Sequence, residues 1–236
     1  LKIVVRAGAG YDNVDLPAAT AGNVVVMNTP GQNSNAVAEL ALGMMVYYVR
    51  NFFNGKAGTE LRGKRLGIHA YGNVGRYVAE IARGFGMELY AYDPFIPKEE
   101  IEKEGVHALE TVEDLYKTCQ FISLHIPAND KTKKSINHEL LSGMPKRPVL
   151  INTARAEVID EEDLAKVFAE REDFAYLTDI APANHAALKE QYGSRYFATP
   201  KKMGAQTAEA NINAGLAAAR QIVAFLTKGD KTFQVN

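Results

Sequence analysis

One stretch decides the fold, Arg65-Leu-Gly-Ile-His-Ala-Tyr-Gly-Asn-Val-Gly-Arg-Tyr-Val-Ala-Glu-Ile-Ala-Arg-Gly-Phe-Gly-Met-Glu-Leu-Tyr-Ala-Tyr-Asp93. Its first part, residues 66–70, is a short and mostly apolar run, which predicts a strand buried on both faces. Two glycines follow, and apolar side chains then recur at helical spacing over residues 74–85. Residues 87–92 predict a second strand, which ends at the acid Asp93.

A glycine turn between a strand and a helix is typical of a dinucleotide site. Gly72 and Gly75 let the backbone approach a pyrophosphate, which binds the amides of Gly72, Asn73, Val74 and Gly75 at the start of the helix. Asp93 lies eighteen positions after Gly75, close to the ~20 expected for an acid that binds the ribose diol. Its negative charge lies where a 2′-phosphate would bind, so the turn favours NAD over NADP.

The glycine pattern has one departure. Ala70 occupies the position of the first glycine of a G-x-G-x-x-G motif. A methyl group is tolerable there if the φ angle of Ala70 stays negative. The alternative is an ordinary strand-to-helix turn; the flanking periodicity and Asp93 favour dinucleotide binding.

Composition excludes several classes of function. The 236 residues include 27 basic and 28 acidic side chains, and the net charge of −1 offers no bulk attraction to nucleic acid or to an anionic membrane. No apolar run approaches the ~20 residues that span a bilayer. Cys119 is the single cysteine, so no internal disulfide forms. We expect a cytoplasmic protein with neither a nucleic-acid nor a membrane partner.

Strands and helices alternate along the chain. This alternation predicts an α/β fold with a doubly wound parallel sheet. The expected strands cover residues 2–6, 24–27, 66–70, 87–92, 121–126, 148–152, 174–178 and 196–199. The longer expected helices cover residues 35–50, 74–85, 161–171 and 207–227. The helix at 35–50 is apolar around most of its surface, which predicts burial between layers or against a second subunit.

Polar side chains follow several of the expected strands. Asp93, Arg155, Asp179 and either Lys201 or Lys202 come just past strand ends. In open α/β sheets ligands bind along the edge that holds the carboxyl ends of the strands. Each side chain alone could be a surface charge or a helix cap, but four at one edge beside a phosphate turn predict a shared site.

A second glycine-containing loop follows the first expected strand. Arg6 ends that strand, and Gly8, Ala9 and Gly10 follow. The glycines suit close approach of the backbone to a ligand, which makes these four residues candidates for substrate contact. The alternatives are a plain turn and, for Arg6, a surface ion pair.

Several segments together carry a family resemblance. They are Arg6-Ala-Gly-Ala-Gly-Tyr-Asp-Asn-Val-Asp15, Asn28-Thr-Pro-Gly-Gln-Asn33, Val37-Ala-Glu-Leu-Ala-Leu42, the glycine turn, Tyr92-Asp-Pro94, Ser123-Leu-His-Ile-Pro127, Asn152-Thr-Ala-Arg155, Thr178-Asp-Ile180 and Thr199-Pro200. In this order they resemble the D-2-hydroxyacid dehydrogenases, and most closely the branch that oxidises 3-phosphoglycerate. The resemblance covers essentially the whole chain.

The resemblance implies a Rossmann-type NAD domain with part of a second, smaller substrate domain. Residues 1–30 would be the last part of the substrate domain, 31–200 the NAD domain, and 201–236 the catalytic loop and the return helix. We expect an N-terminal portion before Leu1 and no regulatory domain after Asn236. The resemblance also implies a homodimer formed through the NAD domain.

The family's catalytic set is an arginine, a glutamate and a histidine. Arg155 matches the arginine, which binds the substrate carboxylate. Asn184 stands at the position of the glutamate, and Lys202 at that of the histidine if the loop is aligned on Met203-Gly-Ala205; alignment on Thr199-Pro200 selects Lys201 instead. Asp179 would orient the nicotinamide amide. The resemblance adds further cofactor contacts at Ile126, Thr153 and Ala154, and a substrate contact at Asn33.

Both departures from the family pattern have one chemical explanation. A histidine, with a pKa near ~6.5, needs a carboxylate to hold its proton, whereas a lysine near ~10.4 does not. Neutral Asn184 therefore suits a lysine acid/base better than a glutamate would. The resemblance implies NAD-dependent oxidation of 3-phosphoglycerate to 3-phosphohydroxypyruvate, in serine biosynthesis. The alternatives are reduction of glycerate, glyoxylate or hydroxypyruvate class substrates, and a non-catalytic NAD-sensing module.

Overall fold

The chain forms two compact units in the computed structural model, which describes residues 1–11 and 13–236. The larger unit contains residues 38–204, and the smaller one contains residues 1–37 and 205–236. Asp12, which belongs to the predicted glycine loop after the first strand, lies outside the described residues.

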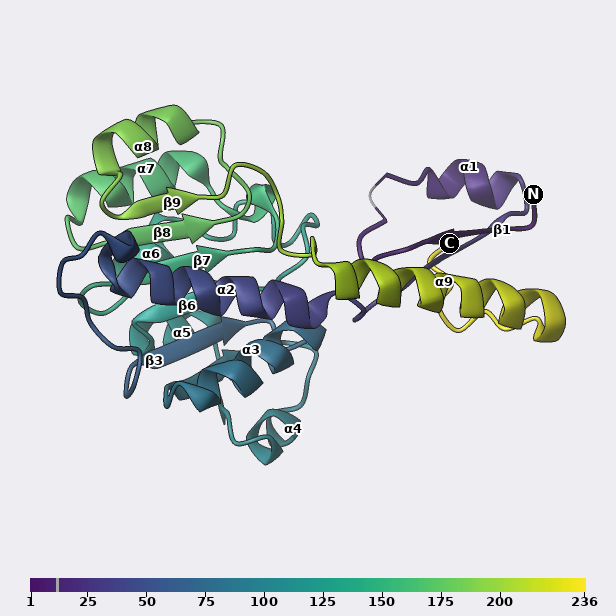
Figure 1. Ribbon diagram of the computed structural model, residues 1–236, viewed down its shortest axis with the longest axis horizontal. Coiled ribbons are helices and arrows are strands. Elements are labelled where there is room, and N and C mark those ends of the chain that lie inside the picture. Colours follow the sequence, from purple (N-terminus) through teal and green to yellow (C-terminus); the bar gives the residue numbers. More distant parts are fainter. Residues whose placement is uncertain (12) are drawn as a thin grey trace. The chain divides into compact units, whose positions relative to one another are not determined.

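The larger unit is built on a parallel sheet of seven strands (Figure 1). The strands are β3 (Arg65–His69), β4 (Glu88–Tyr92), β5 (His107–Ala108), β6 (Phe121–Leu124), β7 (Val149–Asn152), β8 (Ala175–Thr178) and β9 (Tyr196–Ala198). Their order in the sheet is β5-β4-β3-β6-β7-β8-β9. The chain winds outward from β3 in one direction and from β6 in the other, so the doubly wound fold is confirmed. The order reverses between β3 and β6, where ligands bind in sheets of this type.

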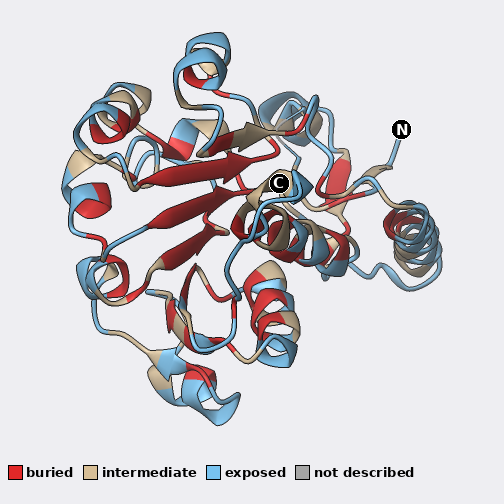
Figure 2. Ribbon diagram, turned by 60° about the vertical axis from the view of Figure 1, so that its left-hand side comes forward, coloured by how far each residue is buried: buried red, intermediate tan, exposed pale blue. Residues whose placement is uncertain are grey.

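Helices cover both faces of this sheet. One core cluster joins the sheet to α2 (Ser34–Val49), α3 (Asn73–Gly84) and α4 (Lys98–Lys103). The other joins it to α5 (Val112–Thr118), α6 (His138–Ser142), α7 (Glu161–Glu170) and α8 (His185–Tyr192). Leu150 and Ile151, consecutive in β7, contribute to opposite clusters, as the alternation of side chains along a strand requires. Figure 2 shows the buried strands between the partly exposed helices.

Five helices begin where the sequence supplies a capping side chain. Each cap accepts a hydrogen bond from a backbone N–H group two or three residues later, which satisfies a donor that the helix leaves unpaired. The caps are Asp15, Thr111, Asn137, Asp160 and Thr207. The expected helices that follow Asp160 and begin near Thr207 are confirmed.

The smaller unit contains a parallel pair of strands, β1 (Ile3–Arg6) and β2 (Val25–Asn28), with α1 (Leu16–Ala21) and α9 (Ala208–Lys228). The C-terminal tail extends this pair, because the Val235 amide donates to the Val26 carbonyl at 2.9 Å and Gln234 bridges antiparallel to Met27.

The sequence did not predict every element. The two-residue strand β5, helix α8 and the short 3₁₀ turns η1 (Asn51–Phe53) and η2 (Ala156–Val158) were not expected. The strand expected over residues 121–126 ends at Leu124. Within the part of the chain that the structure describes, no helix combines the length and the apolar character needed to cross a membrane.

Candidate functional site

The carboxyl ends of the parallel strands bring most of the predicted site residues to one edge of the large unit. They lie in six segments, each of which follows a strand of the sheet. Following β3 are Ala70 and residues 72–75; following β4 is Asp93; following β6 is Ile126; following β7 are Thr153, Ala154 and Arg155; following β8 are Asp179 and Asn184; following β9 are Lys201 and Lys202. The sheet thus places a phosphate turn, two acids and three cations along the edge where such folds bind ligands.

The two glycines of the turn have different neighbours. A Cβ atom on Gly75 would lie 2.5 Å from the Ala70 carbonyl oxygen, so only glycine allows α3 to pack this closely on the turn. A Cβ atom on Gly72, the N-cap residue of α3, would meet nothing within 4 Å. No side-chain hydrogen bond caps this helix at Gly72, which leaves its first amides for an anion, as such a site requires.

Ala70 does not meet the condition set from the sequence. Its φ angle is +78°, not negative. The Ala70 amide donates to the Tyr92 carbonyl at 2.9 Å, and this bond continues the pairing of β3 with β4 into the turn. The backbone therefore keeps the left-handed shape that a first glycine normally provides, at a cost of about 1–2 kcal/mol for a residue with a Cβ atom.

Asp93 supports the glycine turn directly. Its Oδ2 atom accepts a hydrogen bond from the Tyr71 amide at 2.8 Å, and its Oδ1 atom accepts one from the Phe95 amide at 2.9 Å. Each carboxylate oxygen has capacity for a further hydrogen bond, so the diol of a ribose can still bind there. Tyr71 is itself buried, and its hydroxyl donates to Glu104 Oε2 at 2.9 Å.

Two histidines lie buried beneath the turn. His69 ends β3, and its carbonyl accepts a hydrogen bond from the His125 amide at 2.9 Å. Burial lowers the pKa of His69 to about 4, and burial followed by the repulsion from His69 lowers the pKa of His125 to about 3. Both imidazoles are therefore neutral at physiological pH. His69 contacts the Tyr116 hydroxyl through Nδ1 at 3.3 Å.

Asp179 holds the loop that carries the two lysines. Its side chain is buried, with 1% of the residue exposed. The Oδ2 atom accepts hydrogen bonds from the Met203 amide at 3.1 Å and the Gly204 amide at 2.7 Å. The Oδ1 atom is buried and accepts no hydrogen bond from any described residue. A buried carboxylate oxygen without a donor is costly, so Oδ1 fits a ligand that carries an N–H group.

Arg155 and Lys202 meet at one acceptor. The Ala154 carbonyl accepts a hydrogen bond from Arg155 Nη1 at 2.9 Å and one from Lys202 Nζ at 3.4 Å. The other lysine, Lys201, lies in the same loop, and its carbonyl accepts a hydrogen bond from Thr199 Oγ1 at 2.7 Å. The fold therefore places a guanidinium and an ammonium group side by side at the end of β7.

Asn184 is the N-cap residue of α8, but its side chain makes no capping hydrogen bond. Its Oδ1 atom is buried and accepts no hydrogen bond from the described residues, so no hydrogen bond links that oxygen to Lys202. Thr153 is also buried, and its Oγ1 atom has no partner among the described residues. Sequence reasoning missed Thr199 as a loop anchor, because a threonine after a strand has no pattern that distinguishes it.

The remaining predicted residues, Arg6, Gly8, Ala9, Gly10 and Asn33, belong to the smaller unit. The loop after β1 is tied to the residues after β2: the Gly8 amide donates to Thr29 Oγ1 at 2.6 Å, and the Ala9 carbonyl accepts from Asn28 Nδ2 at 2.6 Å. Gly8 has a φ angle of +147°, which favours glycine.

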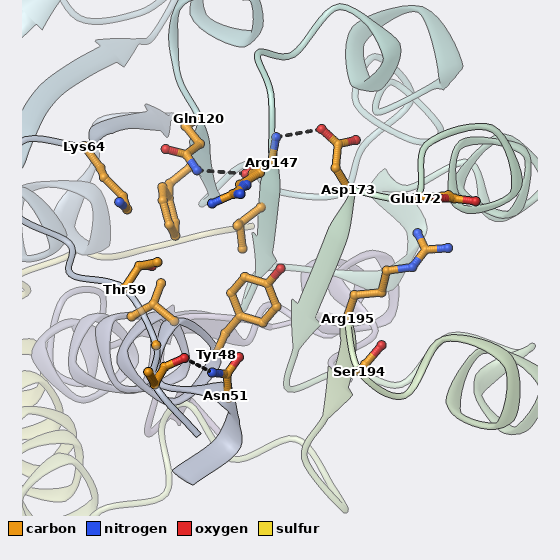
Figure 3. Close-up of a pocket in the computed structure, with 15 residues that line it drawn as sticks. Tyr48, Asn51, Thr59, Lys64, Gln120, Arg147, Glu172, Asp173, Ser194 and Arg195 are labelled. Carbon is orange, nitrogen blue, oxygen red and sulfur yellow. Dashed lines mark hydrogen bonds between the residues drawn. The ribbon is translucent and has the colours of Figure 1, made fainter. Parts of the chain in front are cut away.

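A cavity of about 370 Å³ lies at the opposite, amino-terminal edge of the sheet (Figure 3). Lys64, Gln120 and Arg195, which line it, directly precede β3, β6 and β9. Arg195 is committed to the fold, because its guanidinium donates to the carbonyls of Phe168, Arg171 and Phe174. The predicted site residues lie at the other edge, which we take as the functional one because of the strand order.

Comparison with known proteins identifies the family. Residues 47–200 match the family described as "D-isomer specific 2-hydroxyacid dehydrogenase, NAD binding domain". The chain is 36% identical to a D-3-phosphoglycerate dehydrogenase of Methanocaldococcus jannaschii over 94% of its own length and 45% of the relative's. It is also 36% identical to a hydroxypyruvate reductase of Thermotoga maritima, over 92% and 74% of the two lengths.

Solved structures agree. The crystal structure of an NAD⁺-bound 3-phosphoglycerate dehydrogenase of Entamoeba histolytica is 50% identical, with a TM-score of 0.92 over 100% of this chain and 76% of that one. The chain spans about half the length of several curated relatives that it matches. With an NAD-binding family match over most of the larger unit, and the glycine turn at its switch point, the chain belongs to the D-isomer specific 2-hydroxyacid dehydrogenases.

Proposed function

We propose that the protein oxidises 3-phosphoglycerate to 3-phosphohydroxypyruvate with NAD, the entry step of serine biosynthesis. The observation that carries this proposal is the meeting of Arg155 and Lys202 at the Ala154 carbonyl, with distances of 2.9 Å and 3.4 Å. The guanidinium of Arg155 can bind a carboxylate, and the amine of Lys202 can accept and return a proton. The D-3-phosphoglycerate dehydrogenases among the relatives support the choice of substrate.

The residues at the carboxyl edge fit NAD. The amides at Gly72, Asn73, Val74 and Gly75 would hold the pyrophosphate, because the space beside Gly72 is open and the helix dipole favours an anion. Asp93 would bind the adenosine ribose. The unpaired Oδ1 atom of Asp179 fits the amide group of the nicotinamide. Ala70, Ile126, Thr153 and Ala154 complete the proposed cofactor contacts, and NAD supplies the hydride acceptor when bound.

The chain's own residues manage the charge and the proton. Arg155 binds the substrate carboxylate, in a bidentate manner where the geometry allows. Neutral Lys202 accepts the proton of the 2-hydroxyl group as the C2–H bond breaks and its hydride leaves for the coenzyme, so a carbonyl forms and the substrate loses one proton and one hydride. Asn184 has no charge, so it does not raise the pKa of the lysine as a glutamate would.

The candidates for substrate contact in the smaller unit are Arg6, Gly8, Ala9, Gly10 and Asn33. We propose that residues 1–30 and 201–236 belong to the substrate domain and 31–200 to the NAD domain. We also propose a cytoplasmic homodimer formed through the NAD domain; the apolar side chains of α2 themselves pack into the core of their own chain.

A second activity has its own support. The hydroxypyruvate reductase of T. maritima is matched over 74% of its length, more than the archaeal dehydrogenase. Reduction of hydroxypyruvate needs the same arginine and acid/base, and it differs in lacking the phosphate. A protein that binds NADH but turns over no 2-keto acid would instead be an NAD-sensing module.

The test is NADH oxidation by the full-length protein with phosphohydroxypyruvate, hydroxypyruvate and glyoxylate. We expect phosphohydroxypyruvate to give the highest kcat/KM. Lys202→Ala should lower kcat ~10²-fold or more, the usual scale for a general acid/base. Lys202→Arg should also be slow, because a guanidinium keeps its charge but does not release its proton.

Lys201→Ala provides the comparison within the same loop. If Lys201→Ala shows the large loss instead, Lys201 is the acid/base. Equal activity of all three variants and the wild type would overturn the proposed mechanism. In the oxidation direction the rate should rise with pH above neutrality, because the base is the deprotonated amine.

A further inference from the structure

The loop between β9 and α9 is held at three points within the larger unit. Thr199 Oγ1 donates to the Lys201 carbonyl at 2.7 Å, at the start of the loop. Asp179 Oδ2 accepts from the Met203 and Gly204 amides at 3.1 and 2.7 Å, at its end. These bonds flank Lys202 on both sides, so they determine where its ammonium group lies.

Asp179 differs from an ordinary loop anchor in its second oxygen. One carboxylate oxygen takes two backbone donors, and the other is buried without a donor among the described residues. Only 1% of the residue is exposed, so bulk water does not supply the missing bonds. At the carboxyl end of β8, the carboxylate therefore has one oxygen committed to the lysine loop and one buried oxygen without a donor among the described residues.

We infer that Asp179 is a positioning residue that couples the binding of the nicotinamide end of NAD to the placement of Lys202. The inference rests on the proposed function, because it takes Lys202 as the acid/base. A hydrogen bond from an N–H group of the coenzyme to Oδ1 gives this oxygen the donor that it lacks, so the carboxylate stays in its present position. The Oδ2 atom then stays in place under the Met203 and Gly204 amides. Coenzyme binding thus fixes the lysine before the substrate reacts.

The first measurement is hydrogen exchange of the Met203 and Gly204 amides in the full-length protein. NAD should slow their exchange in the wild type. Asp179→Ala removes both contacts, and a hydrogen bond to a carboxylate contributes about 1.5–3 kcal/mol, so exchange should become about tenfold faster or more and stay insensitive to NAD. Exchange that is equally slow in Asp179→Ala and the wild type would overturn the inference.

Two further variants separate the coupling from a loss of folding. Asp179→Asn keeps one oxygen that can face the two loop amides, so it should restore slow exchange and recover much of the kcat that Asp179→Ala loses, while KM for NAD stays raised. Thr199→Val removes only the other anchor, so it should lower kcat and leave the Kd for NAD unchanged. A Thr199→Val enzyme with normal kcat would contradict the claim that loop placement limits the reaction.

Thr207→Val is the matched control. Thr207 caps α9 through the Ala210 amide at 3.1 Å, so its loss should lower the thermal stability without altering kcat or exchange at Met203. Different results would contradict the proposed mechanism and the coupling through Asp179. If Lys202→Ala keeps full turnover, the proposed mechanism fails, whatever the exchange shows. If Lys202→Ala is inactive but NAD leaves the exchange of Met203 and Gly204 unchanged, the coupling through Asp179 fails alone.

Discussion

The turn after β3 and the loop after β9 follow strands of the same sheet, and each is held by an aspartate at a strand end. Asp93 accepts from the Tyr71 amide in the turn, and Asp179 accepts from the Met203 and Gly204 amides in the loop. The two carboxylates differ in their second oxygen. Asp93 bonds the Phe95 amide with it, whereas the second oxygen of Asp179 is unpaired among the described residues.

This difference shows what each region contributes. The glycine turn contributes the shape that we propose for a phosphate site, and its residues Gly72 and Gly75 matter because they lack a Cβ atom. The lysine loop carries the side chain that we propose as the acid/base, and its placement depends on a few hydrogen bonds to residues distant in sequence. Variants of the turn should therefore respond to an added side-chain atom or to a charge buried beside it. Variants of the loop should respond to the loss of a single hydrogen-bond acceptor.

Acid should lower the stability of the protein through the two histidines beside the turn. His69 and His125 beneath it have pKa values of about 4 and 3 in the folded protein, below the unfolded value near 6.5. The unfolded state binds more protons in this window, so their contribution to stability is complete above about pH 6.5 and is lost as the pH falls toward 4 and 3. With about 1.4 kcal/mol for each pKa unit, the loss should reach several kcal/mol.

Urea unfolding across this pH range measures the effect. His125→Gln should flatten the pH dependence, because it removes one of the two buried imidazoles. His107→Gln, at an exposed position on the same sheet, is the control and should follow the wild type. An acid loss that His125→Gln leaves unchanged would contradict this explanation.

Gly75→Ala should cost stability. The added methyl group would lie 2.5 Å from the Ala70 carbonyl oxygen and 3.0 Å from Ile68 Cγ2, so α3 must move away from the turn. Overpacking of this kind costs about 1–3 kcal/mol, measurable as a lower urea midpoint. Gly84→Ala, at the end of the same helix with nothing within 4 Å of the new atom, should not be destabilised. If Gly75→Ala and Gly84→Ala have the same urea midpoint, the contact between Gly75 and the Ala70 carbonyl is less tight in solution than in the structure.

Gly72→Ala should leave stability nearly unchanged and weaken NAD instead. Its φ angle is −76°, and the added atom meets no protein neighbour within 4 Å. The methyl group would occupy the space that we assign to the pyrophosphate, so the Kd for NAD should rise about tenfold, or about 1.4 kcal/mol. Titration of NAD by calorimetry gives this value. An unchanged Kd would place the pyrophosphate elsewhere.

The contrast between turn and loop also explains what the sequence predicted. The turn was predictable because its signals are local: an apolar strand, spaced glycines, helical periodicity and Asp93 all lie between Arg65 and Asp93. Helix α8 was not predicted, because only Leu188 of its residues is buried and no apolar periodicity marks it.

The contacts that hold the lysine loop could not be predicted without the fold. Two alignments of the sequence placed either Lys201 or Lys202 at the acid/base position, and the glycine and helix that follow favoured Lys202. In the structure the Lys202 amine donates to the Ala154 carbonyl, 48 positions away, and Asp179 reaches Gly204 across 25 positions. Contacts at such separations follow from the order of the strands, which a residue pattern does not encode.

Ala70→Gly has the smallest expected effect of these variants, and it tests directly whether the turn is held in a strained backbone shape. With φ at +78°, an alanine costs about 1–2 kcal/mol relative to a relaxed residue. Ala70→Gly removes that strain but makes the unfolded chain more flexible by about 0.4–1 kcal/mol, so stability should rise by roughly 0.5–1 kcal/mol. Ala82→Gly, in the last turn of α3 at an ordinary helical angle, should instead lose stability. If Ala70→Gly were destabilised as much as Ala82→Gly, the turn would not be strained at Ala70, and the tie between its amide and the Tyr92 carbonyl could not be what holds the left-handed shape.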